Sequence, residues 1–273
     1  MIGQKNLHSR IIQLIESDSF PRFSIIVGAR GSEKTELAHQ IACDLHAIIY
    51  DCNIKVDDIR NMITDAYKMH ETMCYVISDA DSMSLAAKNA LLKVTEEPPN
   101  NAYFIMTLEN EYLALETIRS RAQIFYTDLY TPAELTEYAK KLMDGIVGQK
   151  AIQFMVEICK TPGDVEILSK MNIGEFMNYV DLVIDNIAEV SISNAFKIPN
   201  KVALKEDSTG YDLELFWQAF CKLCLNRFET SQNVKYAKAV VLTGDFVKKL
   251  QIKGINRQSL IDMWILAIRK AWS

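Results

Sequence analysis

The chain has 273 residues, of which 49% are hydrophobic and 24% are charged, and this composition excludes a disordered protein. Its net charge of −5 lacks the basic excess of a general nucleic-acid binder, so we expect any contact with DNA to be local or shared with partners. The sequence has no apolar stretch of membrane-spanning length, and its N-terminal segment lacks the apolar core of a signal peptide. We therefore expect a cytoplasmic protein of about two or more domains.

The first half of the sequence alternates short apolar runs with amphipathic helical patterns. We expect strands at residues 23–27, 47–51, 74–77, 102–107 and 123–126. We expect helices at residues 2–16, 36–45, 56–69 and 85–93. Such alternation favours an α/β fold in which helices cover both faces of a parallel sheet.

A glycine-rich turn follows the first expected strand and precedes a helix, which is the context that a P-loop requires. The P-loop pattern is matched by Gly28, Gly31, Lys34 and Thr35. In a P-loop, backbone N–H groups bind the phosphates of ATP, the lysine neutralises their charge, and the hydroxyl binds Mg²⁺.

The position before the P-loop lysine is normally glycine, and here it is Glu33. Its side chain would crowd the phosphates and its charge would repel them. Two like charges ~4 Å apart cost on the order of 1 kcal/mol in water and about 4 kcal/mol at a partly shielded site, or up to roughly a thousandfold in affinity. Alternatively, Glu33 is an ordinary acid in the first turn of a helix, where the dipole favours it, and this reading is compatible with an empty site.

Two motifs further along are the most specific in the sequence. Residues 89–99 read NALLKVTEEPP, and residues 118–121 read Ile-Arg-Ser-Arg ahead of the last expected strand. Together they resemble the clamp-loader branch of the AAA+ family, most closely the delta-prime subunits of bacterial DNA polymerase III. The alternative is an ordinary helix and loop of an unrelated α/β domain.

The resemblance covers roughly residues 2–169 and implies a domain organisation. Its implied parts are an AAA+ P-loop-like domain at residues 1–129, a small helical lid at 130–172, and an all-α collar at 173–273. In the family, subunits oligomerise through the collar.

The resemblance also implies that the ATP site is degenerate. On the family pattern, Ser78 stands where an aspartate linked to Mg²⁺ is expected, and Asp79 stands where the catalytic glutamate is expected. A register shift by one residue would instead place Asp79 at the metal. Thr107 is the candidate polar sensor on the next strand, and the lid segment 161–169 lacks the arginine that reaches the γ-phosphate in relatives that hydrolyse ATP. These departures agree, and they predict a chain that binds ATP and Mg²⁺ weakly or not at all and has no ATPase activity of its own.

Arg121 matches the arginine of the family's Ser-Arg motif. In the family, this arginine reaches the ATP of a neighbouring subunit as an arginine finger, and the alternative is a solvated cation in a loop. The partners that the resemblance implies are the other subunits of a hetero-oligomeric clamp loader, the sliding clamp, and primer–template DNA through the assembly.

Two other roles in the same assembly remain open. The chain would be an ATP-hydrolysing motor subunit if its P-loop tolerates Glu33. It would be the clamp-opening subunit if it presents an exposed apolar tip, for which the candidates are Met62, Tyr67 and Met69.

The C-terminal half is expected to be helical. Residues 131–134, Thr-Pro-Ala-Glu, combine three signals of a helix start. A polar loop is expected at residues 205–210, and the final helix is expected at residues 257–272. Trp264 and Ile268 share one face of that helix and are the expected contact surface for assembly, the alternative being a plain helical core.

The six cysteines do not show the spacing of a metal framework. Cys221 and Cys224 lie in an apolar helical pattern and are interpreted as core residues. Many relatives carry a four-cysteine zinc module between the first helix of the P-loop domain and the Walker B strand, but this interval holds only Cys43 and Cys52. No zinc or other metal is therefore expected, and this departure is compatible with a divergent, phage-borne member of the family.

Overall fold

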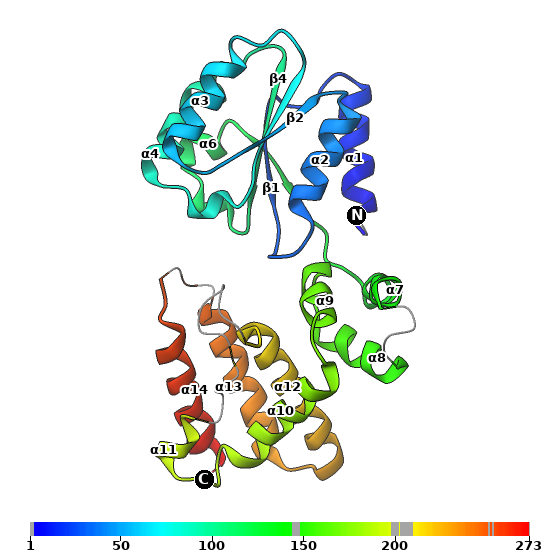
Figure 1. Cartoon of the computed structure of the whole chain (residues 1–273), viewed down its shortest axis with the longest axis vertical. Helices are drawn as coiled ribbons and strands as arrows, with labels where there is room; N and C mark the ends of the chain where they lie inside the picture. Colours follow the sequence, from blue (N-terminus) through cyan, green and yellow to red (C-terminus); the bar gives the residue numbers. More distant parts are fainter. Residues whose placement is uncertain are drawn as a thin grey trace. The chain divides into compact units, whose positions relative to one another are not determined.

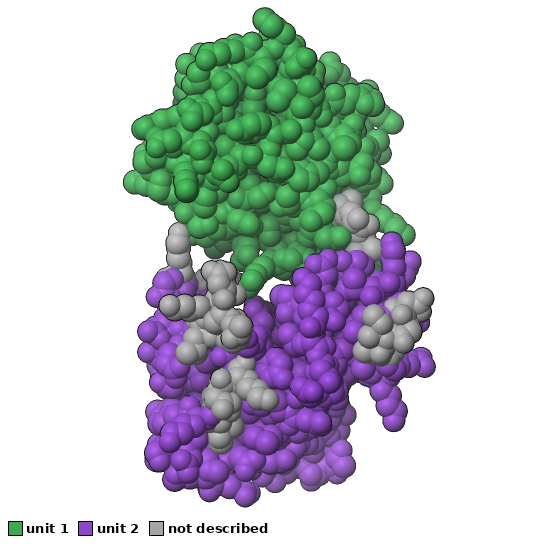
Figure 2. Space-filling view, in the orientation of Figure 1, with its two compact units in different colours: residues 1–134, 161–163 green, residues 135–160, 164–273 purple. Residues whose placement is uncertain are grey.

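The computed structural model describes residues 3–143, 148–197, 202, 210–250, 252 and 254–272. The chain divides into two compact units, one of residues 1–134 and 161–163 and the other of residues 135–160 and 164–273 (Figure 2). The expected lid and collar segments both contribute to the second unit, so the boundary between them stays a prediction. Apart from Gly210, the expected polar loop at residues 205–210 lies outside the described residues.

The first unit is built on a parallel sheet with the strand order β2-β3-β4-β1-β5. The strands are β1 (Phe23–Val27), β2 (Ile48–Cys52), β3 (Met73–Ile77), β4 (Ala102–Leu108) and β5 (Gln123–Tyr126). The predicted strands are confirmed, with bounds that agree to within one residue at each end. Because all the strands run in the same direction, their carboxyl ends share one edge of the sheet, where the sites of such folds gather.

Helices cover both faces of this sheet, as the sequence predicts (Figure 1). One face packs against α1 (Lys5–Glu16) and α2 (Lys34–Asp44). The other face packs against α3 (Val56–Ala66), α4 (Leu85–Ala90), α5 (Leu92–Glu96) and α6 (Glu116–Arg119). Alternation along the strands supplies both cores, because Ile25 belongs to the second core and its neighbour Ile26 to the first. Two short 3₁₀ helices, η1 (Ala80–Ser82) and η2 (Glu111–Leu113), follow β3 and β4.

The helix expected at residues 85–93 is two helices, α4 and α5, which meet at Leu91. Ser84 begins the first of them, because its hydroxyl accepts a hydrogen bond from the backbone N–H of Ala87 at 3.2 Å. Leu91 and Val94 are both fully buried in the core under this segment. The break between α4 and α5 therefore lies where these two side chains pack into the core. The segment consists of helix-forming residues, so its sequence does not predict the break.

The C-terminal half is helical throughout its described residues, apart from short connections and one isolated bridge. Its helices are α7 (Pro132–Leu142), α8 (Gln149–Ile158), α9 (Pro162–Ser169), α10 (Ile173–Asn186), α11 (Ile192–Ala195), α12 (Leu213–Ser231), α13 (Val234–Leu250) and α14 (Arg257–Trp272). The predicted start of α7 is confirmed: the Thr131 hydroxyl accepts from the Glu134 N–H at 3.3 Å, and the Thr131 N–H donates to the Glu134 carboxylate at 2.8 Å. No helix in the described part of the chain is long and apolar enough to cross a membrane.

The last helix, α14, has the predicted bounds but not the predicted role for its apolar face. Trp264 and Ile268 are fully buried. The Trp264 ring packs against Phe216 and Phe220 of α12, and its indole N–H donates to the Thr243 hydroxyl of α13 at 2.9 Å. The expectation that these two residues form an assembly surface is therefore wrong, because α12 and α13 of the same chain already cover that face.

Candidate functional site

The predicted P-loop lies at the carboxyl edge of the sheet. Gly28 directly follows β1, and α2 begins at Lys34, so the loop occupies residues 28–33 between them. Because β1 pairs with β4 and β4 pairs with β3, the segments that follow these strands lie at the same edge. The structure therefore gathers the predicted P-loop, Walker B and sensor segments there.

Three of these segments are joined by short polar contacts. The hydroxyl oxygens of Thr35 and Ser78 are 3.0 Å apart, and the backbone N–H of Asp79 donates to the hydroxyl of Thr107 at 3.0 Å. Thr107 is fully buried, whereas Asp79 has a φ of 52° and turns the chain into η1. It is thus Ser78 that contacts the P-loop threonine, which favours the register with Ser78 at the metal-linked position. The roles of these residues toward ATP stay predictions.

Lys34 is engaged by the loop that precedes it. Its ammonium donates to the backbone carbonyls of Gly28 at 3.0 Å and Ala29 at 2.9 Å, and the residue is buried. Burial lowers the pKa of Lys34, because the charged form loses water, while the carboxylates of Glu109 and Asp79 oppose that shift. These two hydrogen bonds use two of the three N–H donors of the ammonium.

Glu33 has a left-handed backbone conformation, which glycine adopts more readily than glutamate. Its φ is 56° and its ψ is 31°, in the left-handed region, which costs a residue with a Cβ roughly 1–2 kcal/mol. It lies at the N-cap position of α2, so the reading of Glu33 as a first-turn acid is wrong; the acid in the first turn is Glu36. The Tyr130 hydroxyl lies 3.0 Å from the Ser32 carbonyl oxygen and 3.3 Å from a Glu33 carboxylate oxygen. Tyr130 thus contacts the loop at the residue that departs from the family pattern, and burial raises the pKa of its hydroxyl.

The two P-loop glycines lie in close packing, Gly28 against side chains and Gly31 against backbone. A Cβ built on Gly28 would lie 2.1 Å from the Thr127 hydroxyl oxygen. Gly31 has a φ of 73°, and a Cβ there would lie 2.8 Å from Cα of Gly163, whose N–H donates to the Gly31 carbonyl at 3.0 Å. Residues 161–163 belong to the same compact unit as the P-loop. These contacts explain both glycines without invoking a bound phosphate.

The acidic surroundings of Lys34 include two residues that sequence reasoning missed. The Asp81 carboxylate accepts backbone N–H groups of Glu109 at 2.9 and 3.0 Å and of Asn110 at 3.2 Å, and so ties η1 to the end of β4. Loss of solvent raises the pKa of Glu109, and the nearby Lys34 ammonium opposes that rise. Both acids follow strands at the carboxyl edge, which is the signal that could have found them. Together with Asp79 they place negative charge next to Lys34.

The described part of the chain contains no group of three or more His, Cys, Asp or Glu side chains placed to hold a metal ion. Cys221 and Cys224 lie in α12, where Cys224 is fully buried and Cys221 is partly buried. Burial raises the pKa of the Cys221 thiol to about 11 and that of Cys224 further. Both thiols are therefore protonated at neutral pH, as expected of core residues.

Arg121 lies at the surface, directly after α6. Its guanidinium donates to the Thr117 carbonyl oxygen at 2.9 Å and forms an ion pair with the Glu96 carboxylate at 3.2 Å. The Arg121 side chain is 40% exposed. These contacts are with the α5 and α6 segments, and the guanidinium remains accessible to another molecule.

The segment 161–169, which the sequence analysis assigns to the lid, contains α9. Glu166 of α9 accepts a hydrogen bond from the Tyr138 hydroxyl of α7. The three residues proposed as an apolar tip differ in exposure: Met62 is fully buried, whereas Tyr67 and Met69 are 44% and 42% exposed. Met62 is therefore wrong as a member of such a tip.

Comparison with known proteins places the first unit in a family. The family model for the DNA polymerase III delta subunit matches residues 3–128. The N-terminal domain belongs to the DNA polymerase III clamp-loader family. The chain is 24% identical over 214 residues to the tau subunit of Bacillus subtilis DNA polymerase III, a match covering 67% of this chain and 36% of that protein. It is 34% identical over 71 residues to the delta-prime subunit of Haemophilus influenzae, covering 26% of this chain and 22% of that protein.

The fold comparison extends over most of the chain. The RuvB Holliday junction branch migration motor of Thermotoga maritima aligns with a TM-score of 0.53 at 20% identity, covering 85% of this chain and 78% of that one. A DNA polymerase III gamma subunit-related protein of the same organism aligns with a TM-score of 0.50 at 16% identity, covering 99% and 100%. These similarities confirm the predicted AAA+ fold. The chain spans less than half the length of the curated relatives that it matches.

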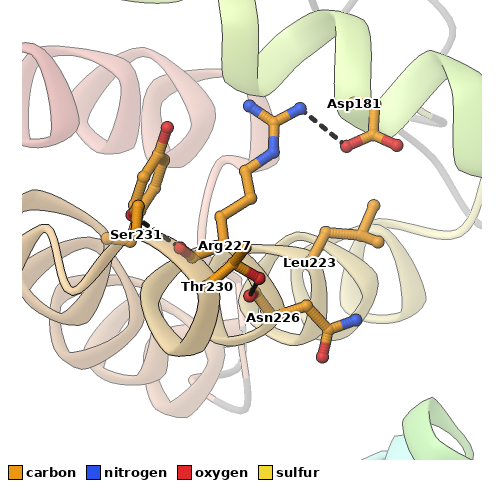
Figure 3. Close-up of a pocket in the computed structure, with 7 residues that line it drawn as sticks. Asp181, Leu223, Asn226, Arg227, Thr230 and Ser231 are labelled. Atoms are coloured by element: carbon orange, nitrogen blue, oxygen red, sulfur yellow. Dashed lines mark hydrogen bonds and ion pairs between the residues drawn. The ribbon is translucent and has the colours of Figure 1, made fainter.

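A cavity of about 430 Å³ in the helical unit has a structural explanation. It is lined by Asp181, Leu223, Asn226, Arg227, Thr230, Ser231 and Tyr236. Arg227 of α12 forms an ion pair with Asp181 of α10 at 2.8 Å (Figure 3). It forms a second ion pair with Asp185 of the same helix. Burial opposes the charge of Arg227, but the hydrogen bonds that its guanidinium donates to these carboxylates prevail and raise its pKa. The charges that line the cavity therefore serve to join α10 to α12.

Proposed function

We propose that this chain is a delta-prime-like subunit of a DNA polymerase III-type clamp loader, which does not hydrolyse ATP itself but supplies Arg121 to the ATP site of a neighbouring subunit. Its partners would be the other clamp-loader subunits and, through the assembly, the sliding clamp and primer–template DNA. The membership of residues 3–128 in the family supports the proposal that the chain joins a clamp loader. The geometry of the P-loop and of Arg121 supports the proposed role within that complex.

The observation that carries the proposal is the contrast between Lys34 and Arg121. Lys34, the residue that would receive phosphates, is buried and hydrogen-bonded to its own loop. Arg121, the residue that would reach out to another subunit, has an accessible guanidinium next to α6. An arginine is suited to that task because its planar fork can hold two phosphate oxygens and stabilise charge that develops during phosphoryl transfer.

The acidic surroundings of the P-loop support the absence of ATP hydrolysis. Asp79 and Glu109 add negative charge next to Lys34, and Glu33 adds a carboxylate to the loop itself. Ser78 offers a neutral hydroxyl where the family pattern expects a carboxylate for Mg²⁺. The weak or absent binding of ATP and Mg²⁺ is thus part of the proposal.

Two observations favour a second candidate, an ATP-hydrolysing motor subunit. The match to the Bacillus subtilis tau subunit spans more of this chain than the match to the delta-prime subunit. The contact between Thr35 and Ser78 also keeps the P-loop next to the Walker B segment. Mg·ATP binding by the isolated chain with a dissociation constant in the low micromolar range, followed by turnover, would establish this candidate instead.

The test of the leading proposal is Arg121→Ala in the complex that a tagged copy of the chain forms with clamp-loader ATPase subunits in its native host. We expect the complex to form, and turnover at the one site that Arg121 completes to fall by about 10³- to 10⁵-fold, because arginine fingers contribute that much in other phosphoryl-transfer systems. Total ATPase activity should fall only in part, since other sites keep their own arginines, while clamp loading should fall further.

Two variants sharpen this test. Arg121→Lys should not restore turnover, because a point charge cannot reproduce the planar fork. Arg60→Ala removes another exposed arginine of the same unit, on α3, and should leave both activities unchanged. Clamp loading at the wild-type rate by the Arg121→Ala complex would refute the role of Arg121.

A further inference from the structure

The ion pair between Arg121 and Glu96 joins two segments whose neighbouring residues are buried in the same core. Glu96 is the last residue of α5, where Val94 is fully buried and Thr95 is also buried. Arg121 follows α6, where Ile118 is fully buried in the same core. The backbone on each side of the pair is therefore fixed, while the two charged side chains meet at the surface.

The geometry of the pair leaves part of the guanidinium available. A guanidinium has five N–H donors. One Nη of Arg121 donates to the Thr117 carbonyl, and the other Nη meets the Glu96 carboxylate. These contacts fix the orientation of the guanidinium plane without using its whole set of donors, so an anion can still bind beside them.

The exposure of the pair argues against a mainly stabilising role. The side chains of Arg121 and Glu96 are 40% and 54% exposed, and an ion pair so accessible to water contributes little to folding. The pair affects the orientation of the guanidinium more than it affects folding stability. An unpaired arginine side chain samples many rotamers, and only one arrangement presents the fork to a phosphate.

We propose that Glu96 is a positioning residue that, with the Thr117 carbonyl, holds the Arg121 guanidinium in the orientation required by the ATP of a neighbouring subunit. The inference rests on the proposed function and adds to it the residue that prepares the arginine. Glu96 touches no substrate in this scheme and acts only through Arg121.

The test is Glu96→Gln in the assembled complex, measured as clamp- and DNA-stimulated ATPase activity with ATP as the substrate. The glutamine keeps the shape of the side chain and removes its charge. We expect kcat of the Arg121-dependent turnover to fall about fivefold, the upper range for an exposed pair, with KM for ATP and formation of the complex unchanged. Glu97→Gln is the matched control, because Glu97 is the adjacent exposed acid, and it should behave as wild type.

A double-variant comparison separates positioning from a general effect on structure. In a complex that already carries Arg121→Ala, Glu96→Gln should cause no further loss, because the side chain that it positions is gone. An equal loss in both backgrounds, an increase in turnover, or a wild-type rate for Glu96→Gln would overturn the inference alone. Wild-type turnover by the Arg121→Ala complex would overturn the proposed function, and this inference with it.

Discussion

Replacing Glu33 tests the left-handed backbone and the charge of the P-loop at once. In Glu33→Gly, release of the left-handed strain should stabilise the chain by about 1–2 kcal/mol. The greater freedom of glycine in the unfolded chain offsets about 0.4–1 kcal/mol of this. Loss of the 3.3 Å contact with Tyr130 offsets about 0.5 kcal/mol more. We therefore expect a free energy of unfolding within about 1 kcal/mol of wild type.

Glu33→Ala is the matched control, because it removes the same carboxylate and keeps a Cβ in the left-handed region. It should be less stable than Glu33→Gly by about 1 kcal/mol, measured by urea unfolding. Equal stability of the two variants would show that the backbone at residue 33 carries no such strain.

The same pair of variants reports on ATP. Removing one carboxylate ~4 Å from a phosphate is worth about 1 kcal/mol in water and about 4 kcal/mol at a shielded site, or roughly five- to a thousandfold in affinity. Titration calorimetry with Mg·ATP should show tighter binding by both variants, and more so by Glu33→Gly, whose backbone lets phosphates approach. Hydrolysis should stay absent. A low-micromolar dissociation constant of the wild-type chain for Mg·ATP would refute the premise that the Glu33 carboxylate weakens phosphate binding.

Two further predictions concern packing. Gly163→Ala should lower the free energy of unfolding by about 1–3 kcal/mol, because its Cβ would lie 2.6 Å from Cα of Gly31. Gly244→Ala is the control: a Cβ there meets nothing within 4 Å, so this variant should raise the free energy of unfolding by about 0.4–1 kcal/mol. Trp264→Ala should cost about 3–5 kcal/mol in thermal unfolding, whereas Met263→Ala, on the exposed side of α14, should change stability by about 0.5 kcal/mol or less. Unchanged stability with loss of assembly in Trp264→Ala would restore the surface role that burial rules out.

The parts of the fold that the sequence predicts well depend on local patterns. The strand bounds follow from short apolar runs, and the start of α7 follows from the capping residues Thr131 and Glu134. Periodicity also placed Met62 and Trp264 on apolar faces correctly. It could not say that helices of the same chain cover those faces, so the surface roles given to both residues were wrong.

The parts of the site that escaped prediction depend on distant contacts. Tyr130 reaches the carbonyl of Ser32 from 98 positions away in the sequence, and Gly163 meets Gly31 from further still. The backbone angle of Glu33 is equally hidden, because glutamate normally avoids the left-handed region. A P-loop pattern names the residues that would bind phosphate, but it does not tell whether other parts of the chain already satisfy them.

That distinction bears on the proposal that this loop binds ATP weakly or not at all. Packing alone requires Gly28 and Gly31, and the loop carbonyls accept the Lys34 ammonium, so each of these residues has a partner within the chain. Glu33 is the exception, because its backbone is strained in a conformation that suits glycine. A loop that still served ATP would gain from glycine at this position in both stability and phosphate contact. The presence of glutamate at this position therefore supports the proposal that this loop binds phosphate weakly or not at all.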